Sequence, residues 1–380
     1  MSSIPIGSSV QSADLSLYGN PTSVDGGHST LSGSNASKLQ RITSSWNEQT
    51  VTWNNKPTVT TAGEVSLAES SAPFEDYLGI DVTTLVHDMV LDPSISHGFQ
   101  FSISSPDHYR RMIFSSSDHP DSQLWPELKV CYVPPAKLNA RVFLDGPFEV
   151  GSALMSDALR TMSLLPLTEP YSALGFVQVG GGGEATVQSV LNTPGANAIV
   201  DWVYVALSPS GSEADIVATR NALLQRDGDV VDMDGVSPVR FIVPIGQYRV
   251  IIKHRNHLGV VTNSSHNISA TQTTSIDLSN GSVQAYGIDP MKLEGSTYTL
   301  WAGDVSHDGL IQYTGLGNDR DLILVEIGGV VPTNTVVGYS TSDVNMNGQI
   351  KYTGLGNDRD PILLNIGGVN PTTIRAAQFP

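Results

Sequence analysis

Acidic and amide side chains recur at a fixed spacing near the end of this 380-residue chain. A 31-residue segment that begins at Asp304 occurs again from Asp343, and the two copies agree at 21 positions, including an unbroken YTGLGNDRD. Each copy has oxygen-bearing side chains at positions 1, 3 and 5, a glycine at 6 and an apolar residue at 8, which is the pattern of a calcium-binding loop. The oxygen-bearing residues are Asp304, Ser306, Asp308, Asp343, Asn345 and Asn347. Because a tandem pair is a stronger signal than a single string, the sequence predicts Ca²⁺ binding rather than catalysis.

The acid that closes each loop must come later than in an ordinary EF-hand. A twelve-residue EF-hand loop closes with a bidentate acid at position 12, where this chain has Gly315 and Gly354. Six residues later each copy has an aspartate, then a short apolar run and a Gly-Gly pair, a pattern that predicts a short helix. We therefore expect Asp321 and Asp360 to close the loops from the start of these helices.

The arrangement resembles the duplicated calcium repeat of dockerins, with a YTGxxN segment inserted in both copies, over about the last 80 residues. The resemblance implies that each copy supplies the side chains named above, a closing acid and a backbone carbonyl at position 7. The closing acids would be Asp321 and Asp360, the alternative closing acids Asp319 and Asp358, and the carbonyl donors Leu310 and Gln349. The other interpretation is that these segments are solvated acidic turns that bind nothing.

The two copies are expected to fold together. A single copy would bury too little apolar surface to stay folded, so helices expected over residues 321–327 and 360–366 should pack against each other in antiparallel orientation. The residues expected at this contact are Ile323, Leu324, Ile327, Ile362, Leu363 and Ile366, with Tyr313 and Tyr352 covering the inserted loops.

Composition is typical of an extracellular, mainly β protein. Only 15% of the residues are charged, whereas 36 glycines, 22 prolines and many Ser, Thr and Val residues predict strands and turns. The net charge of −17 argues against a nucleic-acid partner, because phosphates would be repelled. No stretch approaches the roughly 18 apolar residues of a membrane span. The single cysteine, Cys131, is interpreted as a small core residue. We expect secretion, although MSSIPIGSSV lacks the features of a signal peptide.

Residues 1–133 are expected to form one sandwich domain, because short alternating runs are bounded by turn-forming residues. Residues 83–90 are the exception and could form a helix entered from Asp81 or Thr83. The segment is similar to the DNRLRE family of bacterial secreted jelly-roll modules, some of which bind carbohydrate. The residues that carry the resemblance are Trp46, Glu48, Thr52, Trp53, Pro57, Asp81, Val82, Thr83, Gly98, Phe99, Arg111, Phe114, Ser115, Ser116, Pro126, Leu128 and Tyr132.

Three tryptophans in this segment could stack on sugar rings. We interpret Trp46 and Trp53 as packing residues of the module and favour Trp125, beside Pro126 in a polar loop, as an exposed contact. The family's leading strands are missing before IPIGSSVQSADLSLYG. The sheet edge that this would expose is expected to be completed by a neighbouring copy, head to tail, giving a filament. The alternative is that upstream residues are absent from the sequence.

The rest of the chain is expected to contain a linker and two further domains. Residues 134–137 read as a proline-rich linker, because two prolines stiffen an extended crossing. Residues 138–300 are expected to form an immunoglobulin- or transthyretin-like β-sandwich, and residues 301–380 the repeat domain. The order of segments from VFLDGPFEVGSALMSDALR to the paired NDRD strings is similar to a C-terminal region recurrent in secreted Bacteroidetes proteins.

Other clusters within residues 138–300 have ordinary structural explanations. The four aspartates of residues 227–234 could bind a further calcium ion, but an Asp-Gly-rich hairpin gives the same string. His254 and His257 lie three apart on a predicted strand and are expected to point to opposite faces. The four glycines of 180–183 lack the lysine of a phosphate-binding loop and predict a flexible turn.

Taken alone, the sequence favours a protein that is not an enzyme, because it has no recognisable catalytic motif. The preferred interpretation is an extracellular structural or adhesive protein that is stabilised by calcium and assembles with itself. The alternative is a carbohydrate-binding or accessory region of a secreted polysaccharide-active enzyme.

Overall fold

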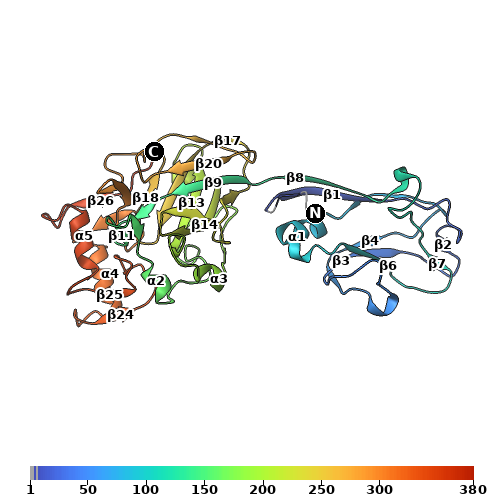
Figure 1. Ribbon diagram of the computed structural model, residues 1–380, viewed down its shortest axis with the longest axis horizontal. Helices are drawn as coiled ribbons and strands as arrows, with labels where there is room; N and C mark the ends of the chain where they lie inside the picture. The colour runs from blue at the N-terminus through green and yellow to red at the C-terminus, as the bar shows by residue number, and fades with distance from the viewer. Residues whose placement is uncertain (1–3, 6) are drawn as a thin grey trace. The chain divides into compact units, whose positions relative to one another are not determined.

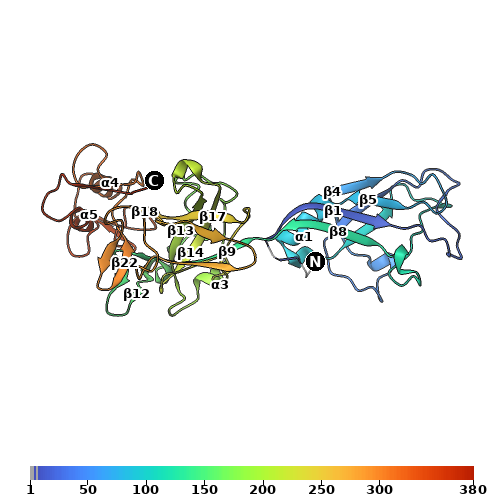
Figure 2. The same ribbon diagram turned by 90° about the horizontal axis from the view of Figure 1, so that it is seen from above.

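The computed structural model describes residues 4–5 and 7–380, which form two compact units, residues 1–135 and 136–380 (Figures 1 and 2). Both units consist mainly of strands in antiparallel sheets with a few short helices, as the alternating runs predict. Residues 1–3 and 6 of the predicted first domain lie outside the described residues. In the described ranges, no helix is long and apolar enough to cross a membrane.

Two three-stranded antiparallel sheets, β5-β1-β8 and β4-β3-β6, form the first unit together with the short pair β2-β7. The strands are β1 Ser9–Leu17, β2 Ser29–Thr30, β3 Ser37–Ile42, β4 Val59–Leu67, β5 Tyr77–Asp81, β6 Phe99–Ile103, β7 Arg110–Arg111 and β8 Glu127–Val133. One α-helix, α1 Thr83–Leu91, and three 3₁₀ turns, η1 Trp53–Asn55, η2 Pro93–Ile95 and η3 Ser122–Leu124, lie between strands. The helix predicted over residues 83–90 is thus confirmed.

One apolar core joins both sheets of the first unit with α1. It takes Leu15 from β1, Leu39 from β3 and Leu85 from α1, all buried. Cys131, expected in the core, is instead exposed on β8. The period-2 alternation of the strand explains this, because Val130 packs against the core and its neighbour must then point the other way.

A nine-stranded sheet is the centre of the second unit (Figure 1). Its main path is β16-β9-β15-β14-β13-β17-β18, with β19 beside β17 and β20 parallel to β9. The strands are β9 Ala136–Arg141, β13 Ile199–Ser208, β14 Ala218–Gln225, β15 Asp229–Val231, β16 Val239–Phe241, β17 Gly246–His254, β18 His257–Val261, β19 His266–Ile268 and β20 Thr273–Asp277. Every residue of β13 is buried, which explains its nearly continuous apolar sequence.

Shorter elements surround this sheet. They are β10 Phe143–Leu144, β11 Phe148–Glu149, β12 Leu154–Met155, β21 Lys292–Glu294, β22 Thr297–Leu300, α2 Ala158–Thr161, α3 Gln188–Leu191 and η4 Glu213–Asp215. Only Pro134 and Pro135 separate β8 from β9, because Ala136 and Lys137, expected in the linker, already pair with neighbouring strands in β9.

The tandem repeat belongs to the same compact unit as the sheet. Its elements are β23 Leu310–Gln312, α4 Asp319–Glu326, β24 Thr335–Val337, β25 Gln349–Lys351, α5 Arg359–Asn365 and β26 Ile374–Ala376. One apolar cluster contains all the residues predicted to join the two helices and the two tyrosines over the inserted loops, and it also takes Leu258 from β18. The predicted apolar contact between the two copies is therefore confirmed, and Leu258 of the sheet shares in it. The antiparallel orientation of the two helices stays a prediction.

Each repeat pairs its loop strand with a strand that follows the other repeat. β23 of the first copy pairs with β26, and β25 of the second copy pairs with β24. The inserted loops are tied in the same crossed way, because Thr314 Oγ1 donates to the carbonyl of Pro371 and Thr353 Oγ1 to that of Pro332, at 2.8 and 2.9 Å. The two copies are thus interlocked.

The repeat helices begin two and one residues earlier than predicted, respectively. Asn318 is the N-cap residue of α4, and Asn357, which precedes the N-cap residue Asp358 of α5, makes the equivalent hydrogen bond in the second copy. Asn318 Oδ1 accepts the N–H of Asp321 at 3.0 Å, and Asn357 Oδ1 accepts that of Asp360 at 2.9 Å.

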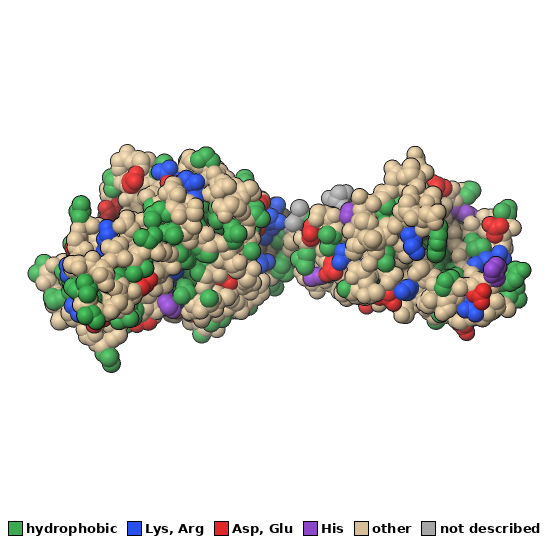
Figure 3. Space-filling view, turned by 90° about the horizontal axis from the view of Figure 1, so that it is seen from below, with side chains coloured by type: hydrophobic (Ala, Val, Ile, Leu, Met, Phe, Trp, Pro, Cys, Tyr) green, Lys and Arg blue, Asp and Glu red, His purple; other side chains and the backbone are tan. Residues whose placement is uncertain are grey.

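Hydrophobic side chains also reach the surface in this part of the chain (Figure 3). They include the fully exposed Leu316, in the first inserted loop.

Candidate functional site

An open groove in the first unit runs beside the edge strand β6. It has a volume of about 700 Å³, and its wall comes from the loop between β3 and β4, from β6 and from residues 106–112. Its aromatic residues are Trp46, Trp53, Phe99 and Phe101. The side chain of Trp53 is 78% exposed and that of Trp46 is 46% exposed. Accessible aromatic faces can stack on the apolar faces of sugar rings.

The loop that carries both tryptophans is held in place by local hydrogen bonds. At its base the hydroxyls of Thr43 and Thr58 lie 2.8 Å apart, and the N–H of Thr43 donates to the carbonyl of Thr58 at 2.8 Å. Further out, the Lys56 ammonium lies 4.1 Å from the centre of the Trp53 ring. This cation–π contact covers part of the ring and brings a positive charge into the groove.

The packing roles predicted for Trp46 and Trp53 are wrong, since both line the groove. Trp125 is exposed as predicted, at 45%, but it does not line the groove. Trp46 and Trp125 each donate the indole N–H to a backbone carbonyl, of His97 and His119 respectively, at 2.8 Å. The two side chains therefore have the same exposure and the same kind of hydrogen bond, and they differ in whether they face the groove.

In the first repeat, two buried aspartates hold the loop from its two ends. Asp304 accepts the N–H groups of residues 308–309 at 3.1 and 3.0 Å. Asp319, at the start of α4, accepts those of Ser306 and Gln312 at 3.0 and 2.8 Å. Both carboxylates are thus fixed by pairs of backbone donors, with almost no exposure to solvent.

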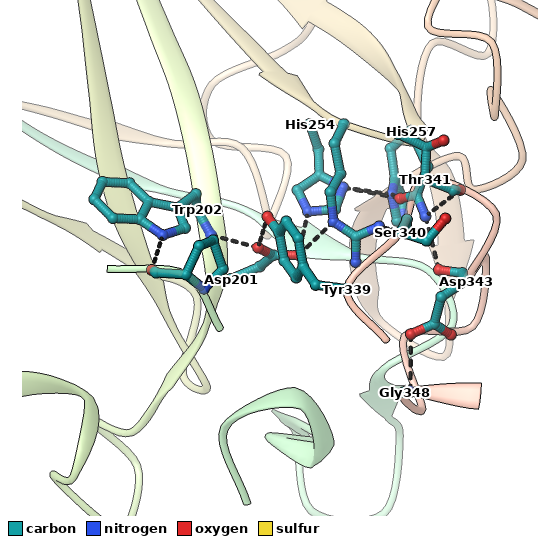
Figure 4. A network of polar contacts seen from close by, with 12 residues as sticks. Asp201, Trp202, His254, His257, Tyr339, Ser340, Thr341, Asp343 and Gly348 are labelled. Atoms are coloured by element: carbon teal, nitrogen blue, oxygen red, sulfur yellow. Dashed lines mark hydrogen bonds and ion pairs between the residues drawn. The ribbon is translucent and has the colours of Figure 1, made fainter. Parts of the chain in front are cut away.

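The second repeat reproduces this pattern. Asp343 accepts the N–H groups of residues 347–348 at 3.0 and 2.8 Å. Asp358 accepts those of Val344 and Lys351, both at 2.8 Å. Figure 4 shows the contact from Asp343 to Gly348 at the edge of a larger network.

The loop backbone is left-handed at two positions in each copy. Gly309 and Gly348, at position 6, have φ values of 85° and 80°, a conformation that glycine adopts without steric cost. At position 4, His307 and Met346 have φ values of 50° and 57°. Non-glycine residues adopt this region at a cost of about 1 kcal/mol, so the tight turn is retained against a local penalty in both copies.

The carboxylates of Asp321 and Asp360 lie outside the loops. Each pairs with the arginine that precedes it, Arg320 or Arg359, at 2.8 Å, and each side chain is about half exposed. The structure therefore brings the acid at position 1 of each copy close to the acid at position 16, which is Asp319 or Asp358. The acid two residues later, Asp321 or Asp360, points away from the loop. This geometry favours the alternative closing acids of the sequence analysis.

Burial and like charge raise the pKa values of the loop aspartates. Burial, together with the neighbouring carboxylates of Asp319 and Asp308, raises the pKa of Asp304 to about 8. Burial raises the pKa of Asp319 to about 6, although backbone N–H groups lower it. In the second copy burial raises the pKa of Asp343 to about 6 and that of Asp358 to about 7. A cation between each pair would offset both penalties.

The other predicted ligands surround these pairs. Ser306 Oγ is buried without a hydrogen-bond partner, and Asp308 and Asn347 accept the N–H two positions further on, at 2.9 and 2.8 Å. Asn345 Oδ1 accepts the N–H of Asn347 at 3.1 Å. Leu310 and Gln349 are the first residues of β23 and β25. Among the described residues, no three His, Cys, Asp or Glu side chains form a metal-binding group by themselves.

The positions of His254 and His257 differ from the prediction. Their Nδ1 atoms lie 2.9 Å apart, because Arg255 and Asn256 form the turn between β17 and β18 and the two histidines face each other across it. Both are buried, and burial lowers the pKa of each. The sequence predicted one continuous strand through residues 254–257 and therefore missed this turn. Asn256 was the available signal, because asparagine is a common turn residue.

The four aspartates of residues 227–234 fit the hairpin explanation. Asp232 pairs with Arg240 at 3.0 Å, and its N–H donates to the carbonyl of Ser237 across the turn that follows β15, at 2.8 Å. Asp234 accepts the hydroxyl of Ser237. These partners account for Asp232 and Asp234 without a metal ion.

Residues 1–130 match the model of carbohydrate-binding module family 96. The matched segment covers the whole groove, including the loop with both tryptophans and β6. No curated protein and no solved structure matches the chain. The first unit is therefore similar to a class of non-catalytic β modules that bind carbohydrate.

Proposed function

We propose that the first unit binds an extracellular polysaccharide in the groove beside β6. The observation that carries this proposal is the pair of exposed rings, Trp53 and Trp46, on the wall of a groove within the segment that matches a carbohydrate-binding family. An exposed indole ring leaves an apolar face in contact with water. Covering that face with the apolar face of a sugar is favourable, so exposed aromatic surface of this kind often marks a binding site.

Polar groups beside the rings can recognise sugar hydroxyls. Thr52, Lys56, Gln100 and Ser102 line the same groove and supply both donors and acceptors. Stacking gives affinity for a sugar ring and the polar groups give orientation, which is the usual division of roles in a binding site. The groove is open, so an internal segment of a long chain can enter it as well as a chain end.

Binding to a panel of soluble polysaccharides, by affinity electrophoresis and then calorimetry, tests this proposal. Trp53→Ala should weaken binding about tenfold, equivalent to about 1.4 kcal/mol, and Trp46→Ala should weaken it less because less of that ring is accessible. Trp125→Ala is the matched control and should bind as the wild type does. Equal affinity of all three variants for every polysaccharide bound would exclude the groove as the site.

A second function is proposed for the repeats: that each loop binds one Ca²⁺. The supporting observation is the repeated pair of buried aspartates whose pKa values are raised by burial and by neighbouring carboxylates. The residues that would hold the ion are Asp304, Ser306, Asp308, Leu310 through its carbonyl and Asp319, and Asp343, Asn345, Asn347, Gln349 through its carbonyl and Asp358. Oxygen donors of this kind suit calcium, which would stabilise the repeat fold.

Calorimetric titration of the metal-free chain with Ca²⁺ tests the second proposal. We expect two ions per chain. The first loop should bind its ion more tightly, because it has three acidic residues and the second loop has two. Asp304→Ala and Asp343→Ala should each remove one ion. A wild-type chain that takes up no calcium would refute the assignment.

In this proposal the chain is a secreted, non-catalytic accessory to polysaccharide use. Self-assembly into filaments stays a prediction from the sequence and is no part of the proposal. Sedimentation velocity of the full chain checks it, because a stable monomer at high concentration would contradict assembly.

A further inference from the structure

The turn between β17 and β18 lies between the two repeats and contacts the first ligand residue of each. Asn256, at the tip of this turn, is fully buried. Its backbone and its side chain contact different copies of the repeat. The turn belongs to the large sheet and lies outside both repeats in the sequence, so the repeat sequences alone do not reveal this contact.

The backbone of Asn256 holds the start of the first loop. Its carbonyl accepts the N–H groups of Gly303 and Asp304, at 3.0 and 3.2 Å. The next residues of β18 continue the contact, because the N–H of Leu258 donates to the carbonyl of Trp301 at 2.9 Å. The sheet therefore positions Asp304 through main-chain contacts with Asn256 and Leu258.

The side chain of Asn256 holds the start of the second loop. Its Nδ2 group donates to the carbonyls of Thr341 and Asp343, at 3.0 and 2.7 Å. Both amide hydrogens are thus used on this segment. The Oδ1 atom faces the Nδ1 atoms of His254 and His257, at 3.0 and 2.8 Å, so the amide orientation is fixed on both sides.

Buried charges keep the turn in place (Figure 4). Arg255 donates from Nε to Asp201 Oδ2 at 2.9 Å and from Nη1 to the carbonyl of Ser340, in the segment that leads into the second loop. Tyr339, in the same segment, donates its hydroxyl to Asp201 Oδ1 at 2.6 Å. Removing a partner from such a network leaves a buried charge or donor unsatisfied, so the turn has little freedom to move away from either loop.

We infer that Asn256 is a positioning residue for both loops and couples them, so that an ion in one loop favours the arrangement that binds an ion in the other. The inference rests on the calcium binding proposed above. Each loop orders the backbone around its first aspartate, and that backbone is fixed on one shared residue. Coupling between two sites is reciprocal, so each loop should raise the other's affinity by the same factor.

Asn256→Ala tests the coupling in the full chain, because it removes the side-chain contacts to the second loop and keeps the backbone contact to the first. Calorimetric titration of single-loop chains (Asp304→Ala or Asp343→Ala) and of the parent chain gives each loop's affinity with and without the other. We expect each loop to bind about tenfold more weakly when the other is disabled. In the Asn256→Ala background this difference should disappear, with the second loop weakened directly.

Asn221→Ala is the matched control, since Asn221 is a buried asparagine of the large sheet whose amide donates to Glu184 and is not among the residues that contact the loops. It should leave the coupling unchanged. The single-loop comparison in the wild-type background needs no Asn256 variant and so holds even if that variant fails to fold. Two ions that bind independently in the wild type would overturn this inference and leave calcium binding standing, whereas no uptake at all would overturn the proposed function itself.

Discussion

The groove of the first unit and the loops of the second place their side chains in opposite environments. Trp53 and Trp46 are 78% and 46% exposed, whereas Asp304 and Asp343 are buried and fixed by backbone donors. In the groove, the proposed sugar binding by Trp53 should be separable from stability, because most of that residue is exposed and it is not part of the apolar core. In the loops, the calcium binding proposed above would be coupled to stability, since an ion bound only by the folded state stabilises that state.

The largest effect should come from the buried network that supports the loops. Burial raises the pKa of Asp201, but Arg255 and His254 outweigh it and hold this pKa well below its usual range. Asp201→Asn leaves the guanidinium buried without its counter-charge and should lower the unfolding free energy by about 3–5 kcal/mol, measured by denaturant titration at pH 7.

The same variant should show a defined pH dependence. A carboxyl with a depressed folded-state pKa contributes stability that is present above its unfolded pKa of about 3.9 and is lost as the pH falls further. The difference in unfolding free energy between wild type and Asp201→Asn should therefore narrow progressively as the pH falls below about 4. Asp118→Asn, an exposed aspartate of the first unit, serves as control. A gap that stays constant with pH would mean that the charge of Asp201 is not what stabilises the unit.

Removal of calcium should separate the two units in a melting experiment. If each loop binds Ca²⁺ as proposed, free calcium at 100 times the Kd would stabilise the second unit by about 2.7 kcal/mol for each occupied loop. Chelation should therefore lower the calorimetric transition of residues 136–380 and leave that of residues 1–135 in place. Equal shifts of both transitions would contradict the contrast drawn above.

The closing acid gives a finer test within one loop. Asp319→Asn should weaken calcium binding by about 10- to 100-fold, roughly 1.4–2.7 kcal/mol, because it removes a carboxylate that faces the loop. Asp321→Asn, two residues away and paired with Arg320 at the surface, should change the affinity less than threefold. Titration of both variants checks this, and the reverse order would restore Asp321 as the ligand.

The smallest effect should be on the stability of the first unit. Trp53→Ala removes a ring that is 78% exposed, so its unfolding free energy should change by no more than about 0.5 kcal/mol, although the same change should weaken polysaccharide binding. Chemical denaturation of the first unit's transition measures it. A loss of several kcal/mol would show that the ring is a structural residue after all.

Local patterns predicted the secondary structure and the apolar faces, because both depend on neighbours in the chain. The β class follows from alternating runs, whereas α1 and the two helices that join Ile323 to Ile362 follow from local helix start and stop signals. The exposure of Trp46 and Trp53 does not. It depends on which side of an irregular loop faces the sheet, and no periodic pattern encodes this.

Sequence reasoning found the aspartates of the loops but not their geometry. The asparagine before Asp319 caps α4, which turns Asp319 toward the loop and Asp321 outward. Arg320 and the Asn318 amide also hold the Asp321 carboxylate outward, and residue spacing cannot show these contacts. The role of Asn256 was out of reach for a different reason, since it lies 48 residues before Asp304 and only the packing of the sheet brings the two together.

The crossed pairing of β23 with β26 and of β25 with β24 sets how many repeats the chain can hold. Each loop strand takes its partner from the other copy, so the pair is closed and neither copy offers a free strand to a third. A stack of such units cannot lengthen one repeat at a time, as solenoids do. Loss of either copy would leave the loop strand of the other without its partner strand, so the two copies should fold only as a pair.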